Sequence, residues 1–140
     1  MVAINYWAVL VSAAVAIGIG YAWYGPIFGK QWIALMGWSM ADMEAKMKQG
    51  VGPQYVLQAV GALLMAFVLL HALVFASSYL HESGVIAGLE TGFWNWIGFI
   101  VPVTLGSVLW DGKPWKLWVL NAAYYLIVLL VMGLILALWV

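Results

Sequence analysis

The sequence predicts an all-α protein, a four-transmembrane-helix up-down bundle, from its composition and from the placement of its lysines. Of the 140 residues, 67% are hydrophobic and only 7% are charged, whereas charged residues make up about a quarter of an ordinary soluble domain. All five basic residues fall in the segments 30–48 and 113–116. Because cytoplasmic loops of membrane proteins are enriched in Lys and Arg, we expect these segments inside and both termini outside.

Four apolar runs are long enough to cross a hydrocarbon core of about 30 Å, which needs about 20 helical residues. These spans are predicted at about residues 4–24, 54–80, 85–110 and 115–140, within a single transmembrane domain over residues 1–140. Gly25-Pro26 is predicted to end the first span, because a residue before proline disfavours the helical conformation. No Lys or Arg precedes residue 30, so we interpret the first span as a retained helix rather than a cleaved signal peptide. The connections between spans two, three and four are short, which predicts antiparallel neighbours.

A short amphipathic helix is predicted in the first cytoplasmic loop, over about residues 39–49. Ser39 and Asp42 have the spacing of a capping box. Lys46 and Lys48 fall in the last turn, where positive charge suits the helix dipole. Three methionines share one face, so we expect the helix to lie on the membrane surface or on the bundle.

Small residues and one amide follow a single face of the third span, at 100° per residue. They are Gly84, Gly88, Gly92, Asn95 and Gly106. Helices in lipid associate by close backbone approach, so this face is predicted to be a helix-packing interface. The sequence leaves open whether the partner is another span of the chain or another copy.

Glu90 projects from the opposite face, together with Trp94, and is the only acidic residue well inside a predicted span. A carboxylate in the membrane is costly unless it is paired, neutralised or hydrated, which makes it a candidate functional group. His71 of the second span has a similar predicted depth, so Glu90, His71 and Trp94 form a candidate proton, ion or ligand site. The structural alternatives are that Glu90 reaches interfacial water and that His71 only packs. Trp94 and Trp96 could instead line a groove for a lipid, quinone or pigment, or act as aromatic anchors.

The remaining composition excludes several classes of site. Cysteine is absent and the net charge is zero, so thiolate chemistry and an electrostatic footprint for nucleic acid are not expected. One histidine with one glutamate falls short of a metal site. No catalytic motif is present, and we therefore expect no enzyme activity, no cofactor and no metal.

Several segments together resemble one family over nearly the full length of the chain. They are residues 4–9 (INYWAV), 23–32 (WYGPIFGKQW), 92–94 (GFW), 98–99 (GF) and 111–117 (DGKPWKL). On these residues the chain resembles the bacterial family known as domain of unknown function 1761, with Trp-Tyr-Gly-Pro the most specific part. The resemblance implies a small four-helix protein of the bacterial inner membrane and brings no activity or site residue.

Two functions from different classes fit these observations. The first is a helix-packing structural or interaction protein, which forms a homo-oligomer or an accessory subunit of a larger membrane complex. Its partners would be the lipid bilayer and other membrane subunits. The alternative is an oligomeric transporter of a small solute or cation that uses the intramembrane carboxylate of Glu90.

Overall fold

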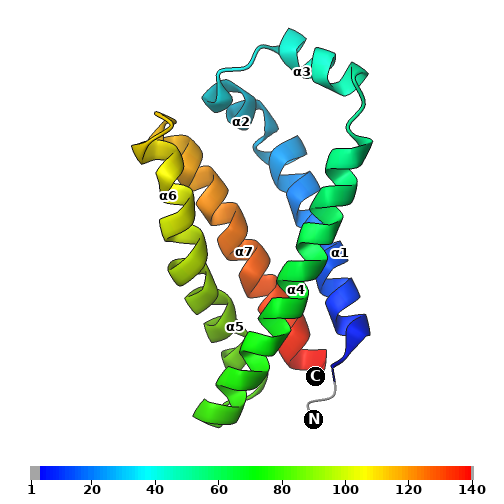
Figure 1. The fold of residues 1–140 in the computed structure, drawn as a ribbon, viewed down its shortest axis with the longest axis vertical. Helices are drawn as coiled ribbons and strands as arrows, with labels where there is room; N and C mark the ends of the chain where they lie inside the picture. The colour runs from blue at the N-terminus through cyan, green and yellow to red at the C-terminus, as the bar shows by residue number, and fades with distance from the viewer. Residues whose placement is uncertain (1–3, 140) are drawn as a thin grey trace.

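The computed structural model describes residues 4–139, so the predicted domain limits at residues 1 and 140 lie outside the described part. Its regular elements are helices (Figure 1). In chain order they are α1 (Tyr6–Ala22), the π-turn η1 (Trp23–Ile27), α2 (Gly29–Met36), α3 (Met40–Lys48), α4 (Gly52–Leu80), α5 (Gly84–Asn95), the π-turn η2 (Trp96–Ile100), α6 (Val101–Leu109) and α7 (Trp115–Trp139). Four stretches are long and apolar enough to cross a membrane: Tyr6–Ile27, Gly52–Leu80, Gly84–Leu109 and Trp115–Trp139. The predicted all-α fold with four long apolar helices is confirmed.

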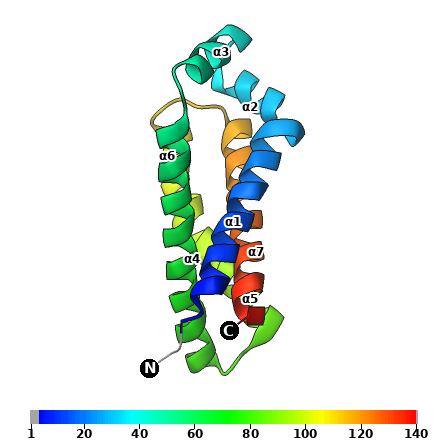
Figure 2. The same cartoon turned by 90° about the vertical axis from the view of Figure 1, so that its right-hand side faces the viewer.

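The long helices run between two ends of the molecule, one with short helices and a loop and the other with the chain termini. Figure 1 shows α2, α3 and the loop after α6 at one end, and both chain termini at the other. The turned view places α3 beyond α2, at the extreme of the molecule (Figure 2). Helix α7 contacts each of the other three long stretches, and α1 also packs on α4. Helix α7 is therefore the central element of the fold.

The closest helix contact joins α5 to α7 through glycines. A Cβ built on Gly88 would fall on the carbonyl oxygen of Gly133, and a Cβ on Gly133 would fall on that of Gly88. One turn further on, a Cβ on Gly92 would lie 2.5 Å from the carbonyl oxygen of Leu129. The two backbones touch because no side chain separates them, as is usual for small-residue interfaces in membranes.

The first long helix does not stop cleanly at Gly25-Pro26 as predicted. Regular α-helix ends at Ala22, and the chain continues through η1, where Gly25 has φ −106° and ψ −105°. Pro26 has no N–H to donate and crowds the preceding turn, and the wider turn is closed by the N–H of Phe28, which donates to the carbonyl of Trp23 at 2.9 Å. The chain then forms α2, a helix that was not predicted.

Helix α3 forms as expected at its N-terminus. The predicted capping box is present: the Asp42 N–H donates to Ser39 Oγ at 3.1 Å, and the Ser39 N–H donates to Asp42 Oδ2 at 2.8 Å. The hydrogen bonds from the Ser39 backbone and hydroxyl lower the pKa of the Asp42 carboxyl. Of the three methionines on one face of α3, Met40 and Met47 are exposed and Met43 is half-buried.

The glycine contact predicts that two Gly→Ala variants differ clearly in their free energy of unfolding. Gly88→Ala forces α5 away from α7 and is expected to lower the free energy of unfolding by about 1–3 kcal/mol, the usual cost of overpacking. Gly61 lies on α4, where an added Cβ would meet nothing within 4 Å. Gly61→Ala is therefore expected to leave the free energy of unfolding unchanged or slightly raised. Denaturant unfolding in mixed micelles, followed by circular dichroism, measures both. Equal stability of the two variants would contradict the contact.

Candidate functional site

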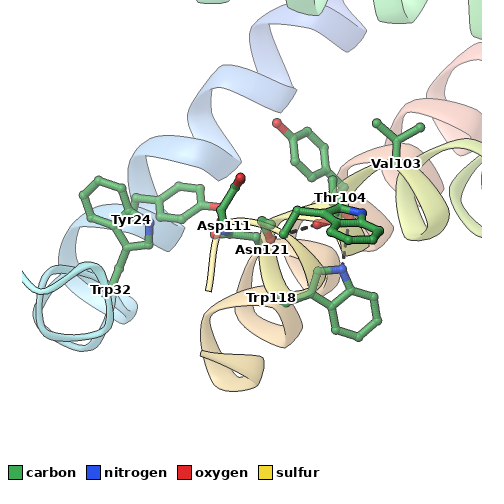
Figure 3. Close-up of a pocket in the computed structure, with 11 residues that line it drawn as sticks. Tyr24, Trp32, Val103, Thr104, Asp111, Trp118 and Asn121 are labelled. Carbon is green, nitrogen blue, oxygen red and sulfur yellow. Dashed lines mark hydrogen bonds between the residues drawn. The ribbon is translucent and has the colours of Figure 1, made fainter. Parts of the chain in front are cut away.

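An open cavity of about 800 Å³ lies between α2, α6 and α7, at the end of the molecule opposite the termini. Its lining residues are Tyr24, Trp32, Val103, Thr104, Gly106, Ser107, Trp110, Asp111, Trp118, Asn121 and Tyr125. Figure 3 shows Tyr24 and Trp32 on one side, Thr104 and Trp118 on the other, and Asp111 and Asn121 between them. Its volume is typical of pockets that hold small organic ligands.

One wall of the cavity is a chain of aromatic rings. Turn η1 and helix α2 bring Tyr24 and Trp32 edge to face, with ring centroids 5.6 Å apart. Trp32 meets Trp38 in the same manner at 5.3 Å, and the ammonium group of Lys46 lies 3.5 Å from the centroid of the Trp38 ring. On its other side Tyr24 meets Tyr124 of α7 at 5.0 Å. The unpredicted helix α2 therefore builds this wall.

Hydrogen bonds hold the polar side chains of the cavity. The Tyr24 hydroxyl donates to Asn121 Oδ1 at 2.8 Å, which ties η1 to α7. The Trp118 indole N–H donates to Thr104 Oγ1 at 3.1 Å, and the Thr104 hydroxyl donates to the carbonyl of Ile100 at 2.6 Å. These bonds fix the orientation of the Tyr24 and Trp118 rings, which line the cavity.

The charged side chain in the lining of the cavity is a carboxylate. Within residues 4–139, Asp111 is the only charged residue that lines it, and Asp111 is exposed. Aromatic faces attract cations through their quadrupole, and a carboxylate adds a full negative charge. The arrangement therefore suits an organic cation with apolar groups better than an anion.

A second cavity, of about 420 Å³, lies behind the same tyrosines, between α1, α4 and α7. Tyr24 and Tyr125 line both cavities, while Tyr55 and Gln58 of α4 line only the second. The two phenol side chains thus form the partition between the two spaces.

The structure does not bring His71 and Glu90 together. His71 lines an apolar cavity with Leu70 and Phe75, and its Nδ1 lies 2.8 Å from the carbonyl oxygen of Phe67. Glu90 instead lines a cavity of about 110 Å³ with Trp94 and, from α4, Ala72 and Ala76. Successive helical residues point about 100° apart, so His71 points to a different side of α4 from Ala72 and lines a different cavity.

The carboxyl group that accompanies Glu90 is that of Glu82, in the loop between α4 and α5. Both residues line the same small cavity, and the hydrogen bond and the charge of Glu90 raise the pKa of Glu82. Because Glu82 lies outside the predicted spans, the sequence indicated Glu90 as an isolated acid.

The predicted glycine face is divided in the structure. Gly88 and Gly92 lie against α7 of the same chain. The Asn95 amide donates to the carbonyl of Thr91 in its own helix at 2.8 Å. A Cβ on Gly84 would meet nothing within 4 Å, and one on Gly106 would meet only the Trp110 side chain, at 3.7 Å. The interface therefore rests on two of the five residues.

The aromatic cavity was not predicted from the sequence. Tyr24 and Trp32 belong to segment 23–32 and Asp111 to segment 111–117, the two longest segments that carry the family resemblance. The signal was present in those segments, but nothing in the sequence showed that they meet.

Comparison with known proteins gives one match. The sequence model of a family described as "Protein of unknown function (DUF1761)" matches residues 7–137. No curated protein and no solved structure matches the chain.

The carboxyl pair predicts a pH dependence of stability. The pKa of Glu82 is raised in the folded protein, so its protonated form stabilises the fold. This contribution to the free energy of unfolding is complete below the pKa of an unfolded glutamate, about 4.3, and is lost as the pH rises through the folded pKa. Glu90→Gln removes the neighbouring charge and is expected to flatten this decline in the unfolding midpoint, measured from pH 4 upward. Glu44→Gln, on exposed α3, is the matched control and should leave the decline intact. A decline that persists in Glu90→Gln would refute the pairing.

Proposed function

The chain belongs to the DUF1761 family of proteins of unknown function, and since that membership brings no activity, we propose a function from the geometry of the aromatic cavity. The protein is a multi-pass membrane protein that binds an amphipathic organic cation in this cavity. The observation that carries the proposal is the aromatic wall of Tyr24, Trp32 and Trp118 around a single carboxylate, Asp111. Pockets of this kind use apolar walls for affinity and a few polar groups for orientation.

The proposal includes a topology in the bacterial inner membrane with both termini outside and residues 1–140 forming one up-down bundle. All five lysines lie in α2, α3 and segment 113–116, at the end of the molecule opposite the termini (Figure 1). An excess of lysine marks the cytoplasmic side. The aromatic cavity would then open at the cytoplasmic headgroup level, where an amphipathic cation gathers from anionic lipid.

The convergence of two distant segments supports the same site. Segments 23–32 and 111–117 carry much of the family resemblance and are separated by most of the chain. Both contribute to the lining of one cavity, through Tyr24, Trp32 and Asp111. A purely structural role for these segments would not require an open space of about 800 Å³ between them.

The two functions expected from sequence receive less support. Association into a homo-oligomer or a larger complex through the glycine face would require α7 to leave Gly88 and Gly92. A transporter that uses Glu90 would place its coupling carboxylate in α5, about 20 Å of helix from Thr104 at the aromatic cavity. Of the residues of the glycine face only Gly106 lines the site proposed here, and Glu90 does not line it.

Tetraphenylphosphonium is a suitable probe of the aromatic cavity. The protein in detergent micelles is expected to bind it, and Asp111→Asn is expected to weaken binding about tenfold, which corresponds to about 1.4 kcal/mol. Trp32→Leu is expected to weaken binding as well, because it removes an aromatic face. Isothermal titration calorimetry gives the dissociation constants.

Two controls separate this site from general partition into the micelle. Glu44→Gln removes a carboxylate remote from the cavity and should bind like the unmodified protein. Tetraphenylborate has the same shape with the opposite charge, and its uptake should not fall in Asp111→Asn. Equal affinity of tetraphenylphosphonium for the unmodified protein, Asp111→Asn and Trp32→Leu would exclude the proposed site.

A further inference from the structure

A small cavity of about 110 Å³ lies at the other end of the molecule, between the C-terminal part of α4 and the first turns of α5. Glu82 lies in the connecting loop, and Glu90, Thr91 and Trp94 project from α5. The cavity is separate from the aromatic cavity and shares no lining residue with it. In the proposed topology it lies on the outer side.

Two carboxyl groups meet at this cavity. Glu82 and Glu90 both line it, and the hydrogen bond and the charge of Glu90 raise the pKa of Glu82. Two ionised carboxylates in contact repel strongly, so such a pair is stable when a proton or a cation lies between them. No lysine or histidine of the described chain lines the cavity to neutralise the pair.

Buried oxygen atoms without partners provide a second, independent observation. Thr91 is only 5% exposed, and its hydroxyl oxygen has no hydrogen-bond partner in the described structure. One carboxylate oxygen of Glu82, Oε2, is also buried without a partner. Buried polar atoms are nearly always satisfied by protein, water or an ion. Of these two oxygens the Thr91 hydroxyl is independent of the carboxyl pair, and an unsatisfied buried oxygen on a residue that lines this small cavity points to an occupant.

The donor atoms indicate the chemistry of that occupant. Besides the two carboxylates and Thr91, the polar side chains that line the cavity are Ser77 and Asn95, whose Nδ2 is already engaged with a backbone carbonyl. Oxygen ligands of this kind suit hard cations, whereas transition metals favour nitrogen and sulfur. Residues 4–139 hold no cluster of three His, Cys, Asp or Glu side chains that could bind a metal, so hydroxyl, amide and water oxygens would have to complete the shell.

We propose that this cavity binds a hard divalent cation of the Ca²⁺ class through Glu82, Glu90 and Thr91. The two carboxylates supply the charge that balances the ion. Because Glu82 lies in the loop between α4 and α5, outside the candidate spans, the ion can enter from solution. With only two charged ligands, we expect a dissociation constant of about 10⁻⁴–10⁻³ M, as in extracellular Ca²⁺ modules. The proposal does not depend on the aromatic cavity or on its ligand.

Terbium(III), a luminescent substitute for Ca²⁺, tests the site in the full chain in detergent micelles. Trp94 lines the cavity, so excitation of tryptophan is expected to produce terbium luminescence that Ca²⁺ displaces. Trp94→Phe is expected to lose most of this luminescence and to keep Ca²⁺ binding measured by calorimetry. This pair of results would place the ion beside Trp94 rather than at another of the ten tryptophans.

Variants of the ligands decide between a cation and a shared proton. Glu90→Gln and Thr91→Val are each expected to weaken Ca²⁺ binding at least tenfold, whereas Thr91→Ser, which keeps the hydroxyl, and Glu44→Gln should retain it. Circular dichroism confirms that each variant is folded, and Thr91→Ala replaces Thr91→Val if that variant does not fold. Absence of Ca²⁺ binding by the unmodified protein, or binding that survives in Glu90→Gln, would overturn the proposal. The pair would then hold a proton alone.

Discussion

The backbone contact between Gly88 of α5 and Gly133 of α7 is the constraint on which the rest of the structure depends. Lipid offers no hydrophobic force that drives apolar helices together, so close packing has to hold them. Because α7 also contacts α1, α4 and α6, its register against α5 sets the positions of the other helices. The same register determines where Thr104 of α6 meets Trp118 of α7, and hence the shape of the aromatic cavity.

The two π-turns convert a simple bundle into one with a site. Turn η1 directs the chain from α1 into α2 and so carries Trp32 to Tyr24. Turn η2 precedes Pro102, and the Trp96 indole at its start donates to the carbonyl of Ala122 at 2.8 Å. Irregular backbone in a membrane needs compensating bonds, because lipid offers none, and in η2 the Thr104 hydroxyl donates one to the carbonyl of Ile100. The aromatic rings of this chain thus hold the irregular segments as well as line the cavity.

Features that depend on local pattern could be predicted, and those that depend on contacts between helices could not. The long apolar helices follow from composition, and the α3 capping box follows from the spacing of Ser39 and Asp42. The depth of His71 and Glu90 along their helices gave no information about rotation around the helix axis, which is why the expected contact is absent. Helix α2 was missed because its eight residues follow a proline and are stabilised by aromatic contacts with η1. The cavity itself required two distant segments to meet.

The partition formed by Tyr24 and Tyr125 has a kinetic consequence. The spaces of about 800 and 420 Å³ on its two sides share these two tyrosines as lining residues. The Tyr24 ring is held by a hydrogen bond to Asn121 and by edge contacts with Trp32 and Tyr124, and side-chain rotation is faster than helix movement, which takes microseconds to milliseconds. Exchange of a small molecule between the two spaces would therefore be limited by breaking that bond and turning a ring. The helices could stay in place throughout.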